Sequence, residues 1–236
     1  MTATLPVALP VQPFKEVGCL DALEPSVIRS LEQRAEKLRF PRGSVFRRQG
    51  DVDPAIYVLT EGRVRLYRLS EEGREQTLWM LGTGQCFCFS SVHHCLPSPY
   101  SVECLSDVTL LKISADQCRE VLAGDARFDA GVIRCLSERV GELARLTESL
   151  ACEPVRRRLA GVLVDLAERH GRRAPDGTLI EDVTHEMLAG STGAAREVVS
   201  RTLKRLEAEG LLRTGRARLL IRDLERLRGE ASSSEV

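Results

Sequence analysis

The chain has 236 residues, 43% hydrophobic and 29% charged, a composition typical of a folded protein with room for two modest domains. Its 34 basic and 34 acidic residues cancel, which argues against a uniformly basic nucleic-acid binder, and no apolar run is long enough to span a membrane. The opening stretch, MTATLPVALPVQPF, lacks a basic n-region and is interrupted by prolines, so we expect no signal peptide and a cytoplasmic location. In that reducing compartment the eight cysteines are not expected to form structural disulfides.

The zero net charge conceals an asymmetry along the chain. Residues 154–228 hold 16 Lys/Arg against 11 Asp/Glu, a net charge of +5, and the remainder holds 18 against 23, a net charge of −5. A basic C-terminal third attached to an acidic body indicates that only this third meets a polyanion.

The N-terminal half changes from helical to strand patterning near residue 40. Apolar residues recur at helical spacing from about Leu20 to Leu38. Short apolar runs then alternate with glycine-containing turns at intervals of about ten residues, which is typical of an antiparallel all-β unit. Within the run at 63–69, Val64 and Leu66 alternate with Arg65 and Tyr67, which predicts a half-buried strand. The runs are AIYVLT (55–60), RVRLYRL (63–69), QTLWML (76–81) and VTLLKI (108–113).

Helical spacing returns after Ser114, and one long helix is expected at 126–152. Its apolar stripe needs a partner, which is either the core of its own domain or the same helix of a second subunit in a two-fold dimer. Glu153-Pro154 ends this helix, and a basic helix follows that stops at Gly171. The stripe consists of Phe128, Val132, Leu136, Val140, Leu143, Thr147 and Leu150.

Residues 184–221 have the pattern of a winged helix-turn-helix, after a short loop RRAPDG at 172–177. Two helices are expected, Thr184–Gly190 and Ala194–Glu209, joined at Gly193. Apolar residues on one side of the second helix would dock on the domain, and polar residues one turn apart would share the solvent side. The segment LLRTGRARLLI (211–221) is expected to form a two-stranded wing with Gly215 at its tip. The docking residues are Val199, Leu203 and Leu206; the solvent-side residues are Arg196, Glu197, Ser200 and Arg201; and the wing offers Arg213, Arg216 and Arg218 to phosphates.

The order of β-roll, long helix and winged helix-turn-helix, with the motif R-E-x-x-S-R at 196–201, resembles the CRP/FNR family of bacterial transcription regulators over roughly residues 14–228. The resemblance implies an α+β fold in three parts: a cyclic-nucleotide-binding-like β-roll sensor domain (1–125), a dimerisation helix (126–152) and a winged helix-turn-helix DNA-binding domain (153–236). It implies a homodimeric regulator that is not an enzyme and binds double-stranded DNA, with RNA polymerase as a further partner and no membrane partner.

The same resemblance assigns roles on DNA. Base edges would be read by Arg196, Glu197, Ser200 and Arg201, since arginine donates to guanine and glutamate accepts from cytosine. This combination is similar to the FNR branch, which favours palindromes with TTGA-type half-sites. Arg216 would hold phosphate from the wing. One position departs from the family, because Ala195 stands where Ser or Thr usually caps the recognition helix.

The segment GQCFCFSSVHHC (84–95) gathers three cysteines and two histidines. Cys86 and Cys88 are two apart, so on an extended strand they point to the same side. Cys95 and Cys104 follow on the next turn and strand, and His93 and His94 are additional candidate ligands. Four thiols suit a tetrahedral zinc site, a three-thiolate metalloid site or an iron–sulfur cluster.

Relatives that bind cyclic nucleotides hold the phosphate with an Arg-Ser pair in this region, but here no arginine lies between Arg74 and Arg119. A buried phosphate would lack a counter-charge, which argues against cyclic AMP. The segment also resembles the CO-sensing haem regulators of the family, with Cys88 at the axial position but Ser90 in place of the axial histidine, for which His93 or His94 could substitute. The sequence therefore favours a bound metal, metalloid, iron–sulfur cluster or redox signal, with haem as the alternative.

Two further interpretations remain open for the cysteines. They can be small buried hydrophobic residues, which we also expect for Cys19, Cys118, Cys135 and Cys152. The chain can alternatively be a metal-handling or thiol-redox protein, although that class gives no role to the arginines and glutamate of the 196–201 motif.

Overall fold

The computed structural model of the chain describes residues 20–87, 96–122 and 124–232. Its contacts divide the chain into two compact units, residues 1–65 with 80–140 and residues 66–79 with 141–236. Over the three described ranges, no helix combines the length and apolarity needed to cross a bilayer.

Residues 36–114 form two four-stranded sheets, with strand orders β1-β8-β3-β6 and β2-β7-β4-β5. The longest pairing joins β3 to β8 in antiparallel register, from Ala55 opposite Ser114 to Glu61 opposite Thr109. The strands predicted at 55–60, 63–69, 76–81 and 108–113 are confirmed as β3, β4, β5 and β8. The bounds are β1 Glu36–Phe40, β2 Val45–Arg47, β3 Ala55–Glu61, β4 Arg63–Leu69, β5 Glu75–Gly82, β6 Cys86–Phe87, β7 Ser101–Cys104 and β8 Val108–Ser114.

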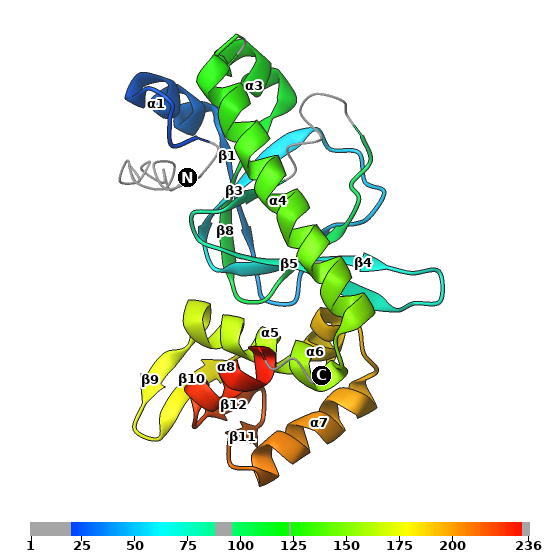
Figure 1. The fold of residues 1–236 in the computed structure, drawn as a ribbon. Coiled ribbons are helices and arrows are strands. Elements are labelled where there is room, and N and C mark those ends of the chain that lie inside the picture. Colours follow the sequence, from blue (N-terminus) through cyan, green and yellow to red (C-terminus); the bar gives the residue numbers. More distant parts are fainter. Residues whose placement is uncertain (1–19, 88–95, 123, 233–236) are drawn as a thin grey trace, which may run out of the picture. The chain divides into compact units, whose positions relative to one another are not determined.

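Three helices cover one face of the β1-β8-β3-β6 sheet (Figure 1): α1 (Pro25–Arg34), α3 (Ala115–Leu122) and the start of α4 (Ala126–Cys152). Alternate strand residues face these helices and form the core of this unit, and the residues between them face the other way. The core includes Ile28 and Leu31 from α1, Ile56, Val58, Leu111 and Ile113 from the sheet, Cys118 and Leu122 from α3, and Phe128 and Val132 from α4.

Two expectations for this region were wrong in detail. The first helix ends at Arg34 and not at Leu38, because Ala35 is extended and Leu38 pairs with Leu110 in the sheet. The strand at 63–69 is buried on both faces over its middle, because Arg65 lies in an ion pair with Glu103 (Nε to Oε2, 2.5 Å). A neutralised arginine can occupy a buried position that its residue type alone does not predict.

The long helix α4 is confirmed, but its apolar stripe has two different uses. Phe128 and Val132 are buried in the core of the first unit. Ile133, Leu136 and Val140 are instead 64%, 43% and 66% exposed in the single chain. The stripe continues as Leu143, Thr147 and Leu150, of which Thr147 is exposed and the two leucines are half-buried. From Ile133 onward its members are alternately three and four residues apart, the spacing of a coiled-coil seam.

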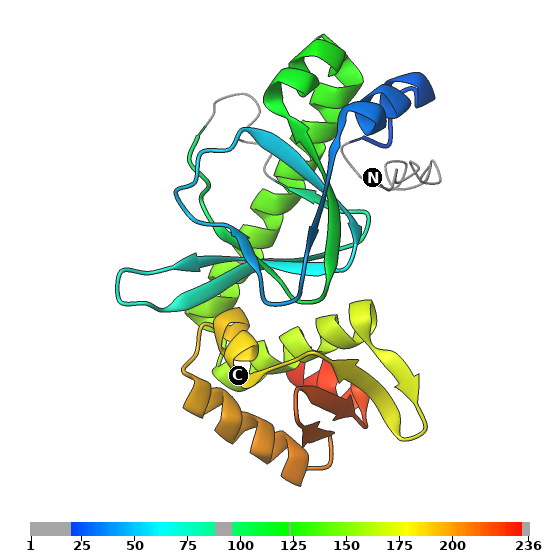
Figure 2. The same cartoon turned by 180° about the vertical axis from the view of Figure 1, so that it is seen from behind.

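The second unit holds the helix-turn-helix and a four-stranded sheet of order β11-β12-β10-β9. The segment RRAPDG was wrongly expected to be a loop, since it contains β9 and the turn into β10 of a hairpin (Figure 2). Its arginines carry no apolar alternation, so the strand pattern was absent from the sequence. The bounds are α5 Val155–His170, β9 Arg172–Ala174, β10 Gly177–Glu181, α6 His185–Thr192, α7 Arg196–Ala208, β11 Leu212–Gly215, β12 Arg218–Ile221 and α8 Leu224–Ser232.

Candidate nucleic-acid interface

The helix-turn-helix begins at a capped helix and turns at a glycine. The Thr184 side chain accepts a hydrogen bond from the Met187 amide at 3.1 Å, which caps α6. Gly193 follows α6 with φ 61° and ψ 30°, a left-handed conformation that glycine adopts without strain. The predicted turn at Gly193 is therefore confirmed.

Helix α7 buries one side and exposes the other. Val199, Leu203 and Leu206 are fully buried, as predicted from their spacing. Arg196, Glu197 and Arg201 are exposed and Ser200 is half-buried, so the structure places the four predicted base-reading residues on one accessible face. With two residues that the sequence pattern did not identify, they line an open hollow of about 440 Å³. The lining residues are His185, Arg196, Glu197, Ser200, Arg201 and Lys204.

The two additional residues have identifiable signals. Lys204 lies three residues after Arg201 and four after Ser200, so helical periodicity alone places it on the same face. His185 is the first residue of α6, and only the packing of the two helices brings it into the hollow. The face therefore combines three cations, a carboxylate, a hydroxyl and an imidazole, which together offer hydrogen-bond donors and acceptors to base edges.

Helix α7 starts without a side-chain cap. Ala195 occupies the N-cap position with φ −65° and ψ 145°, and its methyl group cannot accept from the first amides of α7. These amides point out of the positive end of the helix, which is a favourable place for a phosphate oxygen.

The wing is a tight hairpin. Gly215 pairs with Arg218, so the tip consists of Arg216 and Ala217, and Gly215 itself is the last residue of β11. Ala217 has φ 53°. The expectation that Gly215 forms the tip was wrong by one residue, because the turn needs a left-handed residue and here Ala217 supplies it. Arg213, Arg216 and Arg218 are all exposed.

The basic first turn of α5 faces inward. Arg156 forms ion pairs with Glu209 (Nη2 to Oε2, 2.6 Å) and Glu230 (Nε to Oε2, 2.6 Å). Arg157 and Arg158 donate to main-chain carbonyls of the same unit. The charge excess of residues 154–228 therefore overstates the charge available to DNA.

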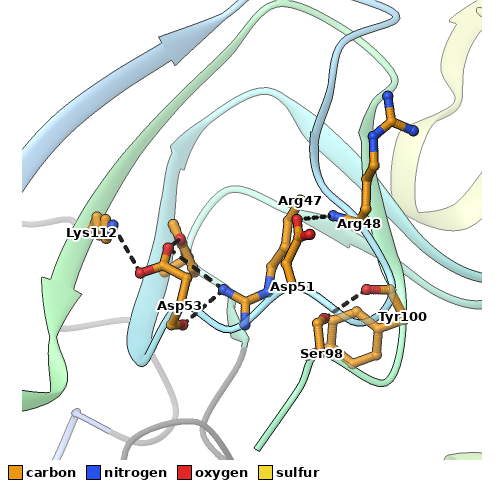
Figure 3. Close-up of polar contacts among 8 residues, drawn as sticks. Arg47, Arg48, Asp51, Asp53, Ser98, Tyr100 and Lys112 are labelled. Atoms are coloured by element: carbon orange, nitrogen blue, oxygen red, sulfur yellow. Dashed lines mark hydrogen bonds and ion pairs between the residues drawn. The ribbon is translucent and has the colours of Figure 1, made fainter. Parts of the chain in front are cut away.

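A charged cluster lies around Asp53, just before β3, with Arg47 from β2 of one sheet and Lys112 from β8 of the other (Figure 3). Arg47, only 2% exposed, donates to the Asp53 carbonyl at 2.9 Å and lies 3.7 Å from its carboxylate. Lys112 lies 3.0 Å from the same carboxylate, and the Tyr57 hydroxyl donates to it. Burial by itself raises the pKa of Asp53, but these hydrogen bonds and cations outweigh it and hold that pKa below its usual range.

The described cysteines lie in separate places. Cys86 pairs with Val58 and belongs to the core beneath the helices, and its neighbour Phe87 stacks on Tyr57 with ring centroids 5.3 Å apart. Cys104 ends β7 in the other sheet, where burial raises the pKa of its thiol to about 11. Among the residues that the structure describes, no three His, Cys, Asp or Glu side chains form a metal-binding group.

The remaining candidate ligands, Cys88, His93, His94 and Cys95, lie outside the described residues, as does Cys19. Of the cysteines expected to pack, Cys118 is buried in the core and burial raises its pKa to about 12. Cys135 packs partly against the same core. Cys152 is exposed, so that expectation was wrong for it, because the end of α4 leaves this side uncovered.

Comparison with known proteins agrees with this arrangement. Residues 37–125 match the cyclic nucleotide-binding domain family, and residues 157–230 match the Crp-like helix-turn-helix domain family. The cyclic AMP receptor protein of Thermus thermophilus is 30% identical over 184 residues, which are 78% of this chain and 82% of that protein. The CRP-like cAMP-activated global transcriptional regulator of Mycobacterium tuberculosis is 28% identical over 211 residues, 89% of this chain and 94% of the relative.

Solved structures show the same fold. A transcriptional regulator of the CRP family from Thermus thermophilus is 28% identical, with a TM-score of 0.72 over 84% of this chain and 97% of that one. A mutant of CooA from Carboxydothermus hydrogenoformans has a TM-score of 0.69 at 24% identity, over 85% of this chain and 89% of that one. The two matched domain families, the long helix between them and these relatives all indicate the same family. The chain belongs to the CRP/FNR family of transcription regulators, which bind DNA and act as dimers.

Proposed function

We propose that this chain is a homodimeric, sequence-specific DNA-binding regulator and not an enzyme, and that α7 reads palindromic TTGA-type half-sites. The observation that carries the proposal is the exposed face of α7, where Arg196, Glu197, Ser200 and Arg201 line one hollow. Arg201 and Arg196 supply bidentate donors for guanine, and Glu197 supplies an acceptor for a cytosine amino group.

The wing supports the same function. Arg213, Arg216 and Arg218 are exposed on one short hairpin and suit phosphate oxygens, which position the protein without reading sequence. The alternative class, a metal-handling or thiol-redox protein, gives no use for this face or for the wing.

The DNA proposal is tested by titrating the protein against a duplex with two TTGA half-sites and against a scrambled duplex over a range of salt concentrations. We expect tighter binding of the palindrome by roughly a thousandfold or more, and a steep loss of affinity with salt for both duplexes. Equal affinity for the two duplexes would contradict sequence-specific recognition.

We assign dimerisation to α4, residues 126–152, with the sensor domain at 1–125 and the DNA-binding domain at 153–236. The support is the exposed series that starts at Ile133, Leu136 and Val140, because a lone helix gains nothing by exposing apolar residues at coiled-coil spacing. A two-fold dimer also matches a palindromic site, since it presents two recognition helices to two half-sites. RNA polymerase is the further partner that a regulator at a promoter would contact.

We propose that the signal acts at the cysteine-rich segment, through Cys86, Cys88, Cys95 and Cys104, with His93 or His94 as additional ligands. Cys86 lies in the core beneath the helices and Cys104 lies in the other sheet, so binding one common group would require at least one of these two side chains to move. The support is the concentration of soft ligands in the sequence and the lack of arginine in residues 75–118.

Cyclic AMP is less well supported as the signal. Two relatives are named for it, but in this chain the buried Arg47 and Lys112 are directed to Asp53, and no arginine stands where the family pattern places the phosphate-binding one. Haem is the second candidate for the cysteine-rich segment.

The signal proposal is tested with anaerobically purified protein. Metal analysis and the absorption spectrum distinguish haem, an iron–sulfur cluster and a colourless metal, and operator affinity is then compared with and without the bound group. A variant with Cys86→Ser and Cys88→Ser should lose both the group and its effect on affinity. If the variant responds like the wild type, the cysteines are packing residues and the signal acts elsewhere.

A further inference from the structure

The first turn of α5 carries three arginines in succession, Arg156, Arg157 and Arg158. The N-terminal turn of a helix is the least favourable place for a cation, because the helix dipole presents its positive end there. Arginines at this position lower the stability of the helix, so other interactions of their side chains must compensate. For Arg156 the gain is its two carboxylate partners, Glu209 and Glu230.

The gain for Arg158 is of a different kind, because its partners are carbonyls at the ends of two other helices. Its Nε donates to the carbonyl of Thr192 at 2.8 Å, the last residue of α6. Its Nη1 donates to the carbonyl of Glu153 at 2.6 Å and lies 3.4 Å from the Leu150 carbonyl, both at the C-terminal end of α4. One guanidinium therefore joins the end of the long helix to the end of the first helix of the helix-turn-helix.

Two helix C-termini that meet at one point repel each other, since each presents unpaired carbonyls and the negative end of its dipole. A guanidinium neutralises the negative ends of both dipoles because it is a cation, and it pairs with the carbonyls because it offers several donors in a fixed plane. A lysine ammonium would supply the charge without that fixed plane.

A second contact joins the same two places. A Cβ atom built on Gly193 would lie 2.6 Å from Cδ2 of Leu150, so the last turn of α4 already presses against the turn that precedes α7. Thr192, next to this glycine, is fully buried. The end of α4 is thus joined to the end of α6 by the Arg158 hydrogen bonds and contacts the turn at Gly193 through Leu150.

We propose that Arg158 is a positioning residue for DNA recognition, which fixes the turn between α6 and α7 to the end of α4. A displacement of α4 is then passed to the recognition helix, while Arg158 itself touches no DNA. This inference rests on the proposed function for its DNA readout, and it extends that function by naming the residue through which the long helix sets the orientation of α7.

The test compares Arg158→Lys with Arg157→Lys as the matched control. Arg157 is the adjacent cation, and its side chain is directed to Glu153 and to the carbonyls of Ala231 and Ser232 instead of the α6 end. Both variants keep the net charge.

We expect Arg158→Lys to bind the TTGA palindrome at least fivefold more weakly, with affinity for a scrambled duplex and its salt dependence unchanged. Arg157→Lys should match the wild type on both duplexes. Equal losses on the two duplexes, or equal losses in the two variants, would overturn the proposal.

Hydrogen exchange provides a readout that needs no DNA. In Arg158→Lys, amides in the last turn of α4 and at residues 192–196 should exchange faster together, and in Arg157→Lys neither segment should change. If the two segments respond independently, Arg158 does not couple them, whatever the DNA measurements show. If they respond together but the wild type prefers no sequence, the proposed function fails and the mechanical link stands.

Discussion

The carboxylate of Glu207 accepts two hydrogen bonds from Thr214, one from the backbone amide and one from the hydroxyl, each 2.9 Å long. Glu207 lies in the last turn of α7, and Thr214 lies in β11, next to Arg213 and near the tip of the wing. The hydrogen bond from the Thr214 amide, with that from its hydroxyl, lowers the pKa of Glu207 below its usual range. These two hydrogen bonds hold the end of α7 to the wing, so the helix proposed to read bases and the hairpin proposed to hold phosphates are fixed to each other.

Replacing Glu207 with alanine should release the wing. The wing arginines would then be less well placed on phosphates, so affinity should fall alike for the TTGA palindrome and a scrambled duplex. The slope of log affinity against log salt should decrease by roughly one for each phosphate that the wing no longer holds. The measurement is a salt titration by fluorescence anisotropy, with Glu225→Ala on α8 as a surface control.

A selective loss on the palindrome, with an unchanged salt slope, would contradict this role for Glu207. It would mean that the carboxylate acts on base reading and not on the wing.

Replacing Ala195 with serine should stabilise the DNA-binding domain. A serine hydroxyl at the N-cap can accept from an amide of the first turn of α7 that the alanine side chain cannot serve, a gain of about 1 kcal/mol. Urea denaturation measures the change, with Ala194→Ser, one position before the cap, as the control. If the two substitutions change stability equally, the effect does not come from capping.

Replacing Val140 with glutamate should give a monomer that no longer binds the palindrome tightly. Val140 is 66% exposed in the single chain, so a charge there leaves the fold of the subunit intact but would be buried in the proposed seam. Sedimentation velocity measures whether the protein is a monomer or a dimer. Glu138→Lys, also exposed on α4 but off the seam, should stay dimeric; a Val140→Glu dimer would place the interface elsewhere.

The Asp53 cluster should make stability depend on pH in the acid range. Because its pKa is lowered in the folded chain, the carboxylate contributes stability that is present above its unfolded pKa of about 4 and is lost as pH falls toward the folded value. Asp53→Asn should therefore be less stable at pH 7 and lose less stability between pH 5 and pH 3. Asp176→Asn, which removes an exposed carboxylate in the β9–β10 turn, is the matched control.

Sequence patterns predicted the helices and strands whose apolar periodicity reflects burial. They did not predict features that depend on contacts with residues distant in the chain. The docking face of α7 followed from the spacing of Val199, Leu203 and Leu206. The contacts of Arg156 and Arg158 with other parts of the domain could not be predicted from the sequence. A run of arginines has the same sequence pattern whether it faces DNA or the ends of helices.

The same limit applies to the candidate sites. Lys204 could have been found from helical spacing, but His185 enters the α7 hollow only through the packing of two helices. Arg47 is a buried cation of the sensor-type domain that lies on β2 beside Asp53, outside the segment where the family pattern places the phosphate-binding arginine.

The central claim, that the exposed face of α7 reads base edges, is tested most directly by a position-by-position binding scan. Affinities of the wild type, Glu197→Ala, Arg201→Ala and Arg216→Ala are measured for the palindrome and for duplexes in which each base pair of the half-site is changed in turn. Glu197→Ala and Arg201→Ala should each lose about 1–3 kcal/mol and relax the preference at one position, while Arg216→Ala weakens all duplexes alike. Equal, sequence-independent losses from all three substitutions would contradict the assignment of α7 as the recognition helix.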